Sequence, residues 1–389
     1  SDRLSLAAQR IGDQTNPLAL EVNHLTTDTS SIGGDQFLLN RKDLSSVNLR
    51  TGETGLVSLG VEGQILDLDP DLDLQSGTLK LDANAGIGTI DSPLQTDTDR
   101  ITAQVREPGD LIIHNNGDLT VETIEGIGGL QTPSGTIVLG VNGSLTLNSD
   151  SSGQAPIQMG DLGNLTLQAN DIKLNSNIQS GGNQTYQGQL LLGTDVRLSS
   201  TQQGAIIFQG TIDSNPNTIP GSLTLETGGI TQFDGAIGSL SPLARLETDN
   251  QALPREKTII NTNQINTIGS QVFNDPVEVS QSLQLTGTDI QFSRSLDSQP
   301  EQNLDLTILA DRFLAQGNLG EQNPFSNLVI TTQNNLEIQG NLFSLNTMDL
   351  TSQQGFIQAV TAPESQTVVI QSDRLSLAAQ RIGDQTNPL

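Results

Sequence analysis

Aliphatic and polar residues alternate in short runs along nearly the whole chain. Each run places two aliphatic side chains on one face of an extended segment, with one polar residue between them, which is the pattern of a half-buried β-strand. Turn-forming residues precede most of the runs. The runs are Leu119–Val121, Leu145–Leu147, Leu165–Leu167, Leu223–Leu225, Leu283–Leu285, Leu336–Ile338 and Leu375–Leu377. The pattern predicts many short strands separated by turns.

The spacing of the runs predicts how the strands are connected. The step from Leu119 to Leu145 is 26 residues, and the step from Leu145 to Leu165 is 20 residues. Such steps are too long for hairpins and fit one full coil of a parallel β-helix, whose connections are nearly always right-handed. No segment shows the sustained spacing of an amphipathic helix. We therefore expect an all-β chain that forms a right-handed parallel β-helix, a solenoid with essentially no α-helix.

Longer duplications follow the same order. Residues 34–40 align with residues 109–115, and residues 213–216 align with residues 297–300. A turn motif, in which three or four residues separate a glycine from a proline, occurs at Gly12…Pro17, Gly88…Pro93, Gly238…Pro242, Gly320…Pro324 and Gly383…Pro388. These matches divide the chain into sub-blocks at about 11–86, 87–165, 174–255 and 260–345. Because one coil cannot bury its aliphatic face alone, such repeats predict a stacked solenoid.

The first eighteen residues of the chain recur without change as its last eighteen. Ser1–Leu18 reappears as Ser372–Leu389, an offset of 372 − 1 = 371 residues. We interpret residues 1–371 as one unit of a tandem repeat and residues 372–389 as the start of the next identical unit. At roughly 20–25 residues per coil, such a unit has about 15–18 coils and is ~70–90 Å long. An artificial duplication of one end is the alternative interpretation.

Charge and composition narrow the classes of partner. The chain has 44 acidic and 17 basic residues, a net charge of −27, which disfavours nucleic acid and membranes as partners. It has no cysteine, a composition compatible with bacterial export, and no apolar stretch long enough to span a membrane. Aromatic residues make up only 3% of the chain, and tryptophan is absent. This scarcity of stacking faces argues against a sugar-binding cleft.

The turn motif and two longer segments carry a resemblance to a known family. The segments are Gly181–Leu198, GGNQTYQGQLLLGTDVRL, and Phe208–Leu243, which begins FQGTIDS and contains GSLTLETGGITQFDGAIGSLSPL. With the turn motif, they resemble the filamentous haemagglutinin-like exoproteins, adhesins of the two-partner secretion type, in the form common among cyanobacteria. The resemblance covers most of the chain, and residues 250–265 and 350–371 match only by coil pattern. It implies a right-handed β-helix, secretion, and adhesion or fibre formation.

The function expected from these features is structural. We expect a non-catalytic, adhesive repeat unit of a secreted bacterial cell-surface fibre, a rigid rod that acts by multivalent contact. Its expected partners are neighbouring copies end to end, rods that associate laterally, and a cell-surface or glycan receptor. Two alternatives stay open: a polysaccharide-active β-helix enzyme, either lyase or hydrolase, and the spacer stalk of a contact-dependent toxin exoprotein. The enzyme would require Asp, Arg or Lys clustered in a groove on successive coils.

One acidic run is a candidate metal site. Asp67, Asp69, Asp71 and Asp73 alternate with apolar residues or proline. In a strand, they would share one face, with neighbours about 6.8 Å apart. A calcium ion takes six to eight oxygen ligands at short range, so binding would also need carboxylates from an adjacent coil. The alternative is a solvated acidic stripe that discourages edge pairing. We expect no other cofactor.

The remaining candidates favour structural roles. His24 and His114 are the only histidines, and neither has a recognisable nucleophile nearby in the sequence. Four glycine pairs lack the Lys-Ser/Thr and helix of a phosphate loop and are expected at tight corners. They are Gly33-Gly34, Gly128-Gly129, Gly181-Gly182 and Gly228-Gly229. The pairs Asn115-Asn116 and Asn334-Asn335 are expected to stack as ladders or to adopt left-handed conformations. No residue is predicted to be catalytic.

Overall fold

Every regular element in the part of the chain that the structure describes is a β-strand. The computed structural model describes residues 2–68, 72–249, 256–360 and 368–383. Within these ranges, the chain forms 41 strands and no helix, and it winds into a parallel β-solenoid of about 17 turns. The predicted all-β solenoid is therefore confirmed. The chain divides into two compact units, the first made of Ser1–Leu190 with Ser200–Gln202, and the second of Leu191–Ser199 with Gln203–Leu389.

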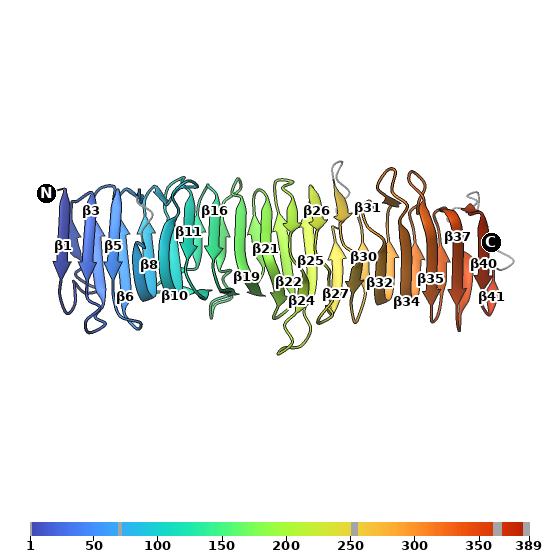
Figure 1. The fold of residues 1–389 in the computed structure, drawn as a ribbon, viewed down its shortest axis with the longest axis horizontal. Helices are drawn as coiled ribbons and strands as arrows, with labels where there is room; N and C mark the ends of the chain where they lie inside the picture. Colours follow the sequence, from blue (N-terminus) through green and yellow to red (C-terminus); the bar gives the residue numbers. More distant parts are fainter. Residues whose placement is uncertain (1, 69–71, 250–255, 361–367, 384–389) are drawn as a thin grey trace. The chain divides into compact units, whose positions relative to one another are not determined.

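The first unit contains short strands that pair with the strands of the next coil (Figure 1). They are β1 (Arg3–Ala7), β2 (Leu18–Leu20), β3 (His24–Asp28), β4 (Gln36–Asn40), β5 (Ser46–Arg50), β6 (Leu56–Val61), β7 (Gln64–Ile65), β8 (Leu74–Ala83), β9 (Gly86–Ile87), β10 (Leu94–Val105), β11 (Leu111–Asn115), β12 (Leu119–Val121), β13 (Thr123–Ile124), β14 (Ile127–Gly128), β15 (Leu130–Thr132), β16 (Ile137–Val141), β17 (Ser144–Asn148), β18 (Ile157–Met159), β19 (Leu165–Asn175), β20 (Ile178–Ser180) and β21 (Gln184–Leu192).

The core of the first unit is built from in-register aliphatic columns. Strands β4, β6, β8, β10, β15 and β18 pair in parallel, and one side chain from each coil enters the same column. This column contains Leu38, Leu59, Leu81, Ala103, Leu130 and Ile157, all buried. A parallel register places like side chains about 4.8 Å apart, so each coil covers the aliphatic face of its neighbour. Period-2 alternation in the sequence thus becomes a continuous apolar interior.

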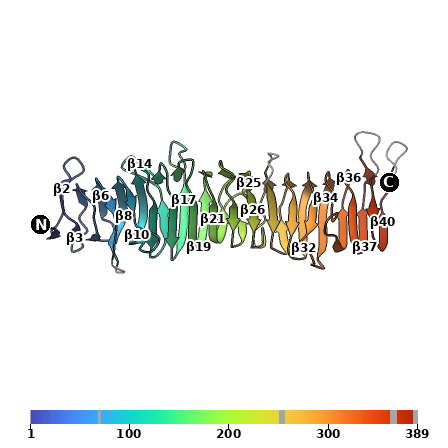
Figure 2. The same ribbon diagram turned by 90° about the horizontal axis from the view of Figure 1, so that it is seen from above.

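The second unit repeats this construction of stacked parallel strands (Figure 2). It contains more aromatic residues than the first unit. Its strands are β22 (Val196–Ser200), β23 (Ile206–Phe208), β24 (Ile212–Ser214), β25 (Ser222–Thr227), β26 (Ile230–Phe233), β27 (Arg245–Thr248), β28 (Lys257–Ile260), β29 (Gln264–Asn266), β30 (Gln271–Phe273), β31 (Val277–Val279), β32 (Leu283–Phe292), β33 (Leu296–Ser298), β34 (Asp305–Ala315), β35 (Phe325–Thr332), β36 (Leu336–Ile338), β37 (Leu342–Ser352), β38 (Phe356–Ala359), β39 (Ile370–Gln371), β40 (Arg374–Ala378) and β41 (Arg381–Ile382).

Phenylalanine rings stack between successive coils of the second unit. Phe208 faces Phe233 with ring centroids 5.4 Å apart, and Phe273 faces Phe292 at 4.9 Å, both nearly parallel. The in-register pairing of β23 with β26 and of β30 with β32 imposes these contacts. Such pairs contribute about 0.5–1.5 kcal/mol beyond the burial of their area. The few aromatic residues of the chain are thus concentrated where they can stack.

The only tyrosine of the chain is also buried. Tyr186 on β21 is 1% exposed, and its hydroxyl donates a hydrogen bond of 2.7 Å to Gln184 Oε1. Burial raises the pKa of the Tyr186 phenol far above its ordinary value. Its polar end is therefore satisfied inside the solenoid without contact with solvent.

The 26-residue step between alternating runs is one coil of the solenoid, as predicted, whereas the predicted 20-residue coil is wrong. Leu119 pairs with Leu145, so the 26-residue step is one coil. Leu145 pairs instead with Ile172, and Leu165 pairs with Ile137. The cause is the length of β19, whose first half pairs with β16 and whose second half pairs with β17. The 20-residue step therefore joins two different faces of the solenoid.

In the described ranges, we find no helix with the length and apolar character needed to cross a membrane.

Candidate functional site: the terminal coils

The two copies of the duplicated segment have the same local structure. The strand β1 runs from Arg3 to Ala7, and β40 runs from Arg374 to Ala378, which is the same stretch 371 residues later. A second short contact comes later in both copies, at Ile11 as an isolated bridge and at Arg381–Ile382 as β41. Residues 3–12 and 374–383 thus have matching strand positions in two different surroundings.

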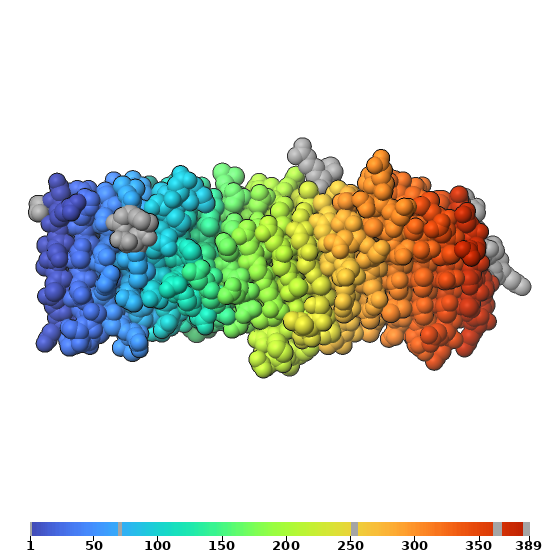
Figure 3. All heavy atoms as spheres, in the orientation of Figure 1, coloured from blue at the N-terminus to red at the C-terminus, as the bar shows by residue number. Residues whose placement is uncertain are grey.

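The surroundings differ in the side from which each copy is paired. β1 pairs in parallel with the next strand in the stack, β3, from Arg3 opposite His24 to Ala7 opposite Asp28. β40 pairs in parallel with the preceding strand β37, from Thr347 opposite Arg374 to Thr351 opposite Ala378. In Figure 3, the first coil, in dark blue, lies at one end of the first unit. One copy therefore pairs with the coil on its C-terminal side, and the other pairs with the coil on its N-terminal side.

The glycine of the turn motif has a left-handed conformation in all five places. The φ angles are 64° at Gly12, 65° at Gly88, 66° at Gly238, 72° at Gly320 and 63° at Gly383. A Cβ added at Gly88 would lie 2.2 Å from the carbonyl oxygen of Ile112 on the next coil, a distance that no side chain can occupy. Only glycine avoids both the strain and the collision. The sequence motif therefore marks one recurring coil junction.

This turn is also hydrogen-bonded to both neighbouring coils. Gly88 N–H donates 2.8 Å to the Ile65 carbonyl of the preceding coil, and the terminal Gly383 donates 2.8 Å to Ile357 in the same way. On the side of the next coil, Phe37 N–H donates 2.7 Å to the Ile11 carbonyl. The N-terminal copy thus makes the hydrogen bond to the next coil, and the C-terminal copy makes the hydrogen bond to the preceding coil.

An arginine in the duplicated segment lies over a phenylalanine ring in both copies. The Arg10 guanidinium is 5.6 Å from the ring centroid of Phe37, on the next coil. Arg381, the same position one repeat later, is 5.3 Å from the ring centroid of Phe356, on the preceding coil. A guanidinium over an aromatic face is attracted by the ring quadrupole, by about 0.5–1 kcal/mol at exposed sites. One arginine position therefore has an aromatic partner on either side.

In both units, aspartate side chains tie several coils to the next coil. In each case, a carboxylate oxygen accepts a backbone N–H from the next coil. The pairs include Asp35 with Leu56, Asp43 with Gln64, Asp110 with Thr136, Asp118 with Ser144, Asp195 with Ser222, Asp213 with Leu240, and Asp297 with Gln322, at 2.8–3.0 Å. Charge-assisted bonds of this kind are stronger than neutral ones. These seven aspartates therefore have a structural role that sequence reasoning missed.

Two of these pairs support the internal duplications. Asp213 and Asp297, aligned in the sequence, both accept backbone N–H groups from the turn motif of the next coil. Burial raises the pKa of Asp297, and the N–H donors from Gln322 and Asn323 oppose this shift. The duplicated tetrapeptide is thus a cap for the duplicated turn.

Asp249 and Asp275 form a buried acidic corner in the second unit. The Asp249 carboxylate accepts a hydrogen bond from the Thr227 N–H and a second, of 3.3 Å, from the Thr231 hydroxyl. Asp275 accepts from the hydroxyls of Thr248, at 2.7 Å, and Thr258, at 2.8 Å. Both carboxyl groups are essentially inaccessible to solvent.

The shifts in this corner come from burial. Burial raises the pKa of Asp249 to about 8, the Thr227 N–H opposes the shift, and the nearby Asp275 and Glu256 carboxylates add to it. Burial likewise raises the pKa of Asp275 to about 6, against the hydrogen bonds from its two threonines. The corner therefore holds a proton on Asp249 at neutral pH. No sequence motif signalled this group, since its members are separated by whole coils.

Of the four predicted calcium ligands, the structure describes Asp67 and Asp73, and neither of them lies in a strand. Asp69 and Asp71 lie outside the described residues. Asp67 and Asp73 lie in the link between β7 and β8 and are buried, at 1% and 2% exposure, whereas Leu68 between them is exposed. Asp73 accepts a 2.7 Å bond from the Gln95 N–H of the next coil. The expected solvated stripe is therefore wrong for the two described aspartates, because Asp67 continues the inward parity of the buried Ile65 and Asp73 bonds to the backbone of the next coil.

No group of three or more candidate metal-ligating side chains gathers anywhere in residues 2–68, 72–249, 256–360 or 368–383. The two histidines lie in different coils, His24 on β3 and His114 on β11. His114 Nε2 lies 3.1 Å from Asn142 Oδ1, a contact between neighbouring coils. His24 lies opposite Ser46 of β5 in the parallel register and lines a surface pocket together with Ser5 and Ser45.

The asparagine prediction is wrong in its detail at Asn115. This side chain is buried and brackets the backbone of Thr98, accepting from its N–H and donating to its carbonyl, both at 3.1 Å. The aligned Asn40 brackets Val22 in the same way, at 3.0 and 2.9 Å. Neither residue has a positive φ. A buried amide satisfies both groups of an otherwise unpaired peptide, which explains its recurrence.

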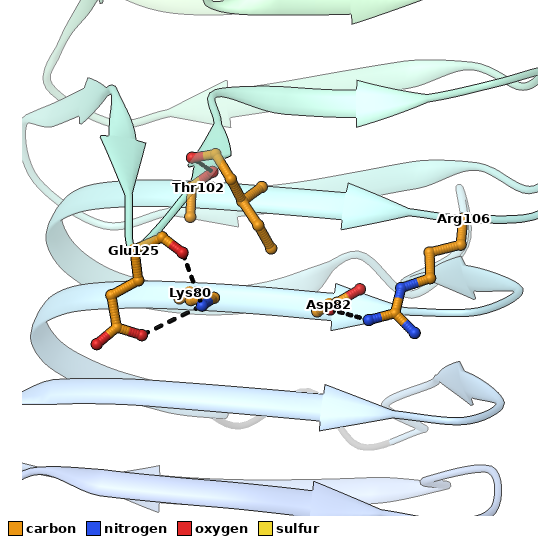
Figure 4. A network of polar contacts seen from close by, with 6 residues as sticks. Lys80, Asp82, Thr102, Arg106 and Glu125 are labelled. Atoms are coloured by element: carbon orange, nitrogen blue, oxygen red, sulfur yellow. Dashed lines mark hydrogen bonds and ion pairs between the residues drawn. The ribbon is translucent and has the colours of Figure 1, made fainter. Parts of the chain in front are cut away.

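A network of polar contacts links the β13–β14 hairpin to the strands β8 and β10 of the first unit (Figure 4). Lys80 Nζ donates to the carbonyl oxygen and to Oε2 of Glu125, both at 3.2 Å. Glu125 sits in the β13–β14 hairpin at a φ of 47°, and Thr102 anchors the hairpin through the carbonyls of Ile127 and Gly129. The network thus holds an antiparallel hairpin against parallel strands.

One shallow groove has the residue types that the enzyme alternative requires. It has a volume of about 360 Å³ and is lined in part by Asp289, Arg312 and Glu337, from β32, β34 and β36 on successive coils. Arg312 Nε lies 2.5 Å from Asp289 Oδ1, so the guanidinium and one carboxylate are already paired. Two of the three charged groups in the groove are therefore engaged with each other.

Comparison with known proteins does not assign the chain to a group: no family model, no curated protein and no solved structure matches it.

Proposed function

We propose that this chain is the structural and adhesive repeat unit of a secreted bacterial cell-surface fibre, in which residues 1–371 form one unit and residues 372–389 begin the next. The observation that carries the proposal is the equivalence of the terminal coils. The strand bounds of β1 and β40 and the glycine conformations agree across an offset of 371 residues. One coil is bonded forward and the other backward, so a further unit would continue the same pairing.

The mechanism of such a fibre is mechanical and multivalent. Stacked coils with aspartate ties give a continuous backbone, and the turns present the same chemistry many times. Repetition raises avidity without new contacts, provided that the sites can be engaged together. The resemblance to haemagglutinin-like exoproteins supports secretion and adhesion as parts of the proposal. The expected partners are adjacent copies and a surface or glycan receptor.

Negative-stain electron microscopy of material from the native source tests the proposal. About 17 turns at ~4.8 Å each predict an axial repeat of ~80 Å along unbranched filaments. Isolated particles of a single unit's length, without end-to-end continuity, would overturn it.

A second candidate function is favoured by the groove of Asp289, Arg312 and Glu337. The arginine would bind a negatively charged group of an acidic polysaccharide, and a carboxyl group of the groove would serve as the general acid or base that cleaves the sugar chain. The test is release of unsaturated or reducing ends from acidic glycans by the purified chain, with Arg312→Ala as the comparison. Equal product from both proteins, or none from either, would exclude this groove as an active site.

A further inference from the structure

The strands β37 and β38 form the surface that pairs with residues 372–383, the described part of the second copy of the duplicated segment. β37 pairs with β39 and then with β40 through Arg374–Ala378, and β38 pairs with β41. Ser372 Oγ lies 2.9 Å from Ser344 Oγ, and Gln380 N–H donates 3.2 Å to the Gly355 carbonyl. The β37–β38 surface thus fits a segment that has the backbone register of β40 and β41 and the side chains of this duplicated sequence.

Every copy of the chain carries a second segment that meets this specification. Residues 1–18 are identical to residues 372–389, and β1 already holds the strand conformation that β40 has on β37. The edge of β1 opposite to β3 corresponds to the edge by which β40 binds β37. The first coil therefore already has the conformation that fits the β37–β38 surface, which within one chain is covered by the C-terminal copy of the same segment.

The two arginine contacts also become compatible at such a joint. In the first coil, Arg10 lies over Phe37, and on β37 and β38 the same position lies over Phe356. The aromatic partners belong to opposite neighbours, so one guanidinium placed between two copies would have a ring on each side. Two aromatic faces for one cation exceed what either terminal copy has alone.

We propose that the β37–β38 surface binds residues 2–12 of a second copy of this chain, in the place that residues 373–383 take within one chain. This inference rests on the proposed fibre function and adds to it a non-covalent joint between separate chains. Within one chain, residues 373–383 compete with the incoming segment at a high effective concentration. The joint therefore forms when the chain's own terminal segment is displaced or weakened.

A full-length variant that weakens only the chain's own terminal segment tests the joint. In Leu375→Asp/Leu377→Asp, the last coil loses both aliphatic contacts, while residues 1–18 remain unchanged. We expect sedimentation velocity to show end-to-end oligomers at concentrations on the order of tenfold below those needed by the unchanged chain. The control variant also carries Leu4→Asp and Leu6→Asp. These changes disrupt the first coil, which is the incoming segment, and should restore the monomer. A monomeric first variant, or equal association of both variants, would overturn the proposal.

Cross-linking checks the register of the joint, and the absence of natural cysteine removes any background. Asp349 lies opposite Ser376, whose counterpart in the first coil is Ser5. In the weakened variant, Asp349→Cys with Ser5→Cys should give a disulfide between two chains, since adjacent strands suit its geometry. Asp349→Cys with Glu53→Cys, an exposed position outside the first coil, should give none. Equal yields from the two pairs would refute the register.

Microscopy separates this inference from the fibre on which it rests. If native filaments show the ~80 Å repeat while the weakened variant stays monomeric, the joint is refuted and the fibre stands as a purely covalent array. If the disulfide forms but native material contains only single units, the joint is supported and the fibre is refuted.

Discussion

Replacing the buried carboxyl group of Asp249 should stabilise the protein at alkaline pH and leave it unchanged in acid. The folded pKa of Asp249 is about 8, against an ordinary value of 3.8. Below about pH 4, the carboxyl group is protonated in both the folded and unfolded states, so it costs nothing. As the pH rises to about 8, the unfolded state releases the proton and the folded state retains it. The free energy of unfolding therefore falls across this window and levels off above it.

The size of the effect is set by the shift. Each pKa unit corresponds to about 1.4 kcal/mol, so a rise of roughly four units sets an upper limit of ~6 kcal/mol. Local opening of the corner would relieve part of this cost, and we expect a gain of about 2–4 kcal/mol for Asp249→Asn at about pH 9. The amide keeps the acceptor for the Thr227 N–H. Asp275 has a pKa of about 6, so the free energy of unfolding of the variant should still fall with rising pH, but only below about pH 6.

Urea unfolding followed by far-UV circular dichroism, repeated from about pH 4.5 to about pH 9, measures this difference. Asp150→Asn is the matched control, because the Ser152 hydroxyl and the backbone N–H groups of Gln154 and Ser152 lower the pKa of that exposed carboxyl. Its loss should remove stability near neutral pH and should not add stability in alkali. Parallel curves for the unchanged chain and Asp249→Asn across the whole range would show that Asp249 is ionised in the folded protein and would refute the reasoning.

The other predictions concern the ties between coils and are checked by thermal and urea unfolding. Gly88→Ala should destabilise by about 3 kcal/mol or more, because strain and collision add, whereas Gly117→Ala, at a φ of 92° with open space, should cost only ~1 kcal/mol. Asn115→Ala, which strips partners from a buried peptide, should cost about 2–3 kcal/mol, and the exposed Asn116→Ala less than ~0.5 kcal/mol. Asp110→Ala should cost about 1 kcal/mol, and Asp110→Asn should restore most of it, since the amide oxygen still accepts the N–H of the next coil.

Sequence alone predicts the strands and the recurring turn because both are local. Alternation identifies a face wherever the chain is straight, and all seven alternating runs fall within strands, for example Leu119–Val121 in β12. A glycine followed at fixed spacing by proline reports a backbone that no other residue can follow, and Gly12 and Gly88 share that backbone. These features need no knowledge of which coil lies next to which.

The candidate site could be predicted only in part, because the rest depends on the register between coils. The identity of the terminal segments is visible in the sequence, but the opposite pairing of β1 and β40 is not. The caps made by aspartates such as Asp110 and the meeting of Asp249 with Asp275 also require the offset from one coil to the next. That offset varies with every loop length. At Asp67, the alternation continues from Ile65 but places a carboxylate on the inward face, which the sequence alone does not reveal.

The single tyrosine, Tyr186, is an intrinsic absorbance probe of local opening. No tryptophan competes with its absorbance, and its buried phenol must reach solvent before it can lose a proton. After a rapid jump to about pH 11.5, the appearance of tyrosinate absorbance would therefore time the opening of a single coil in the middle of the chain, without any label.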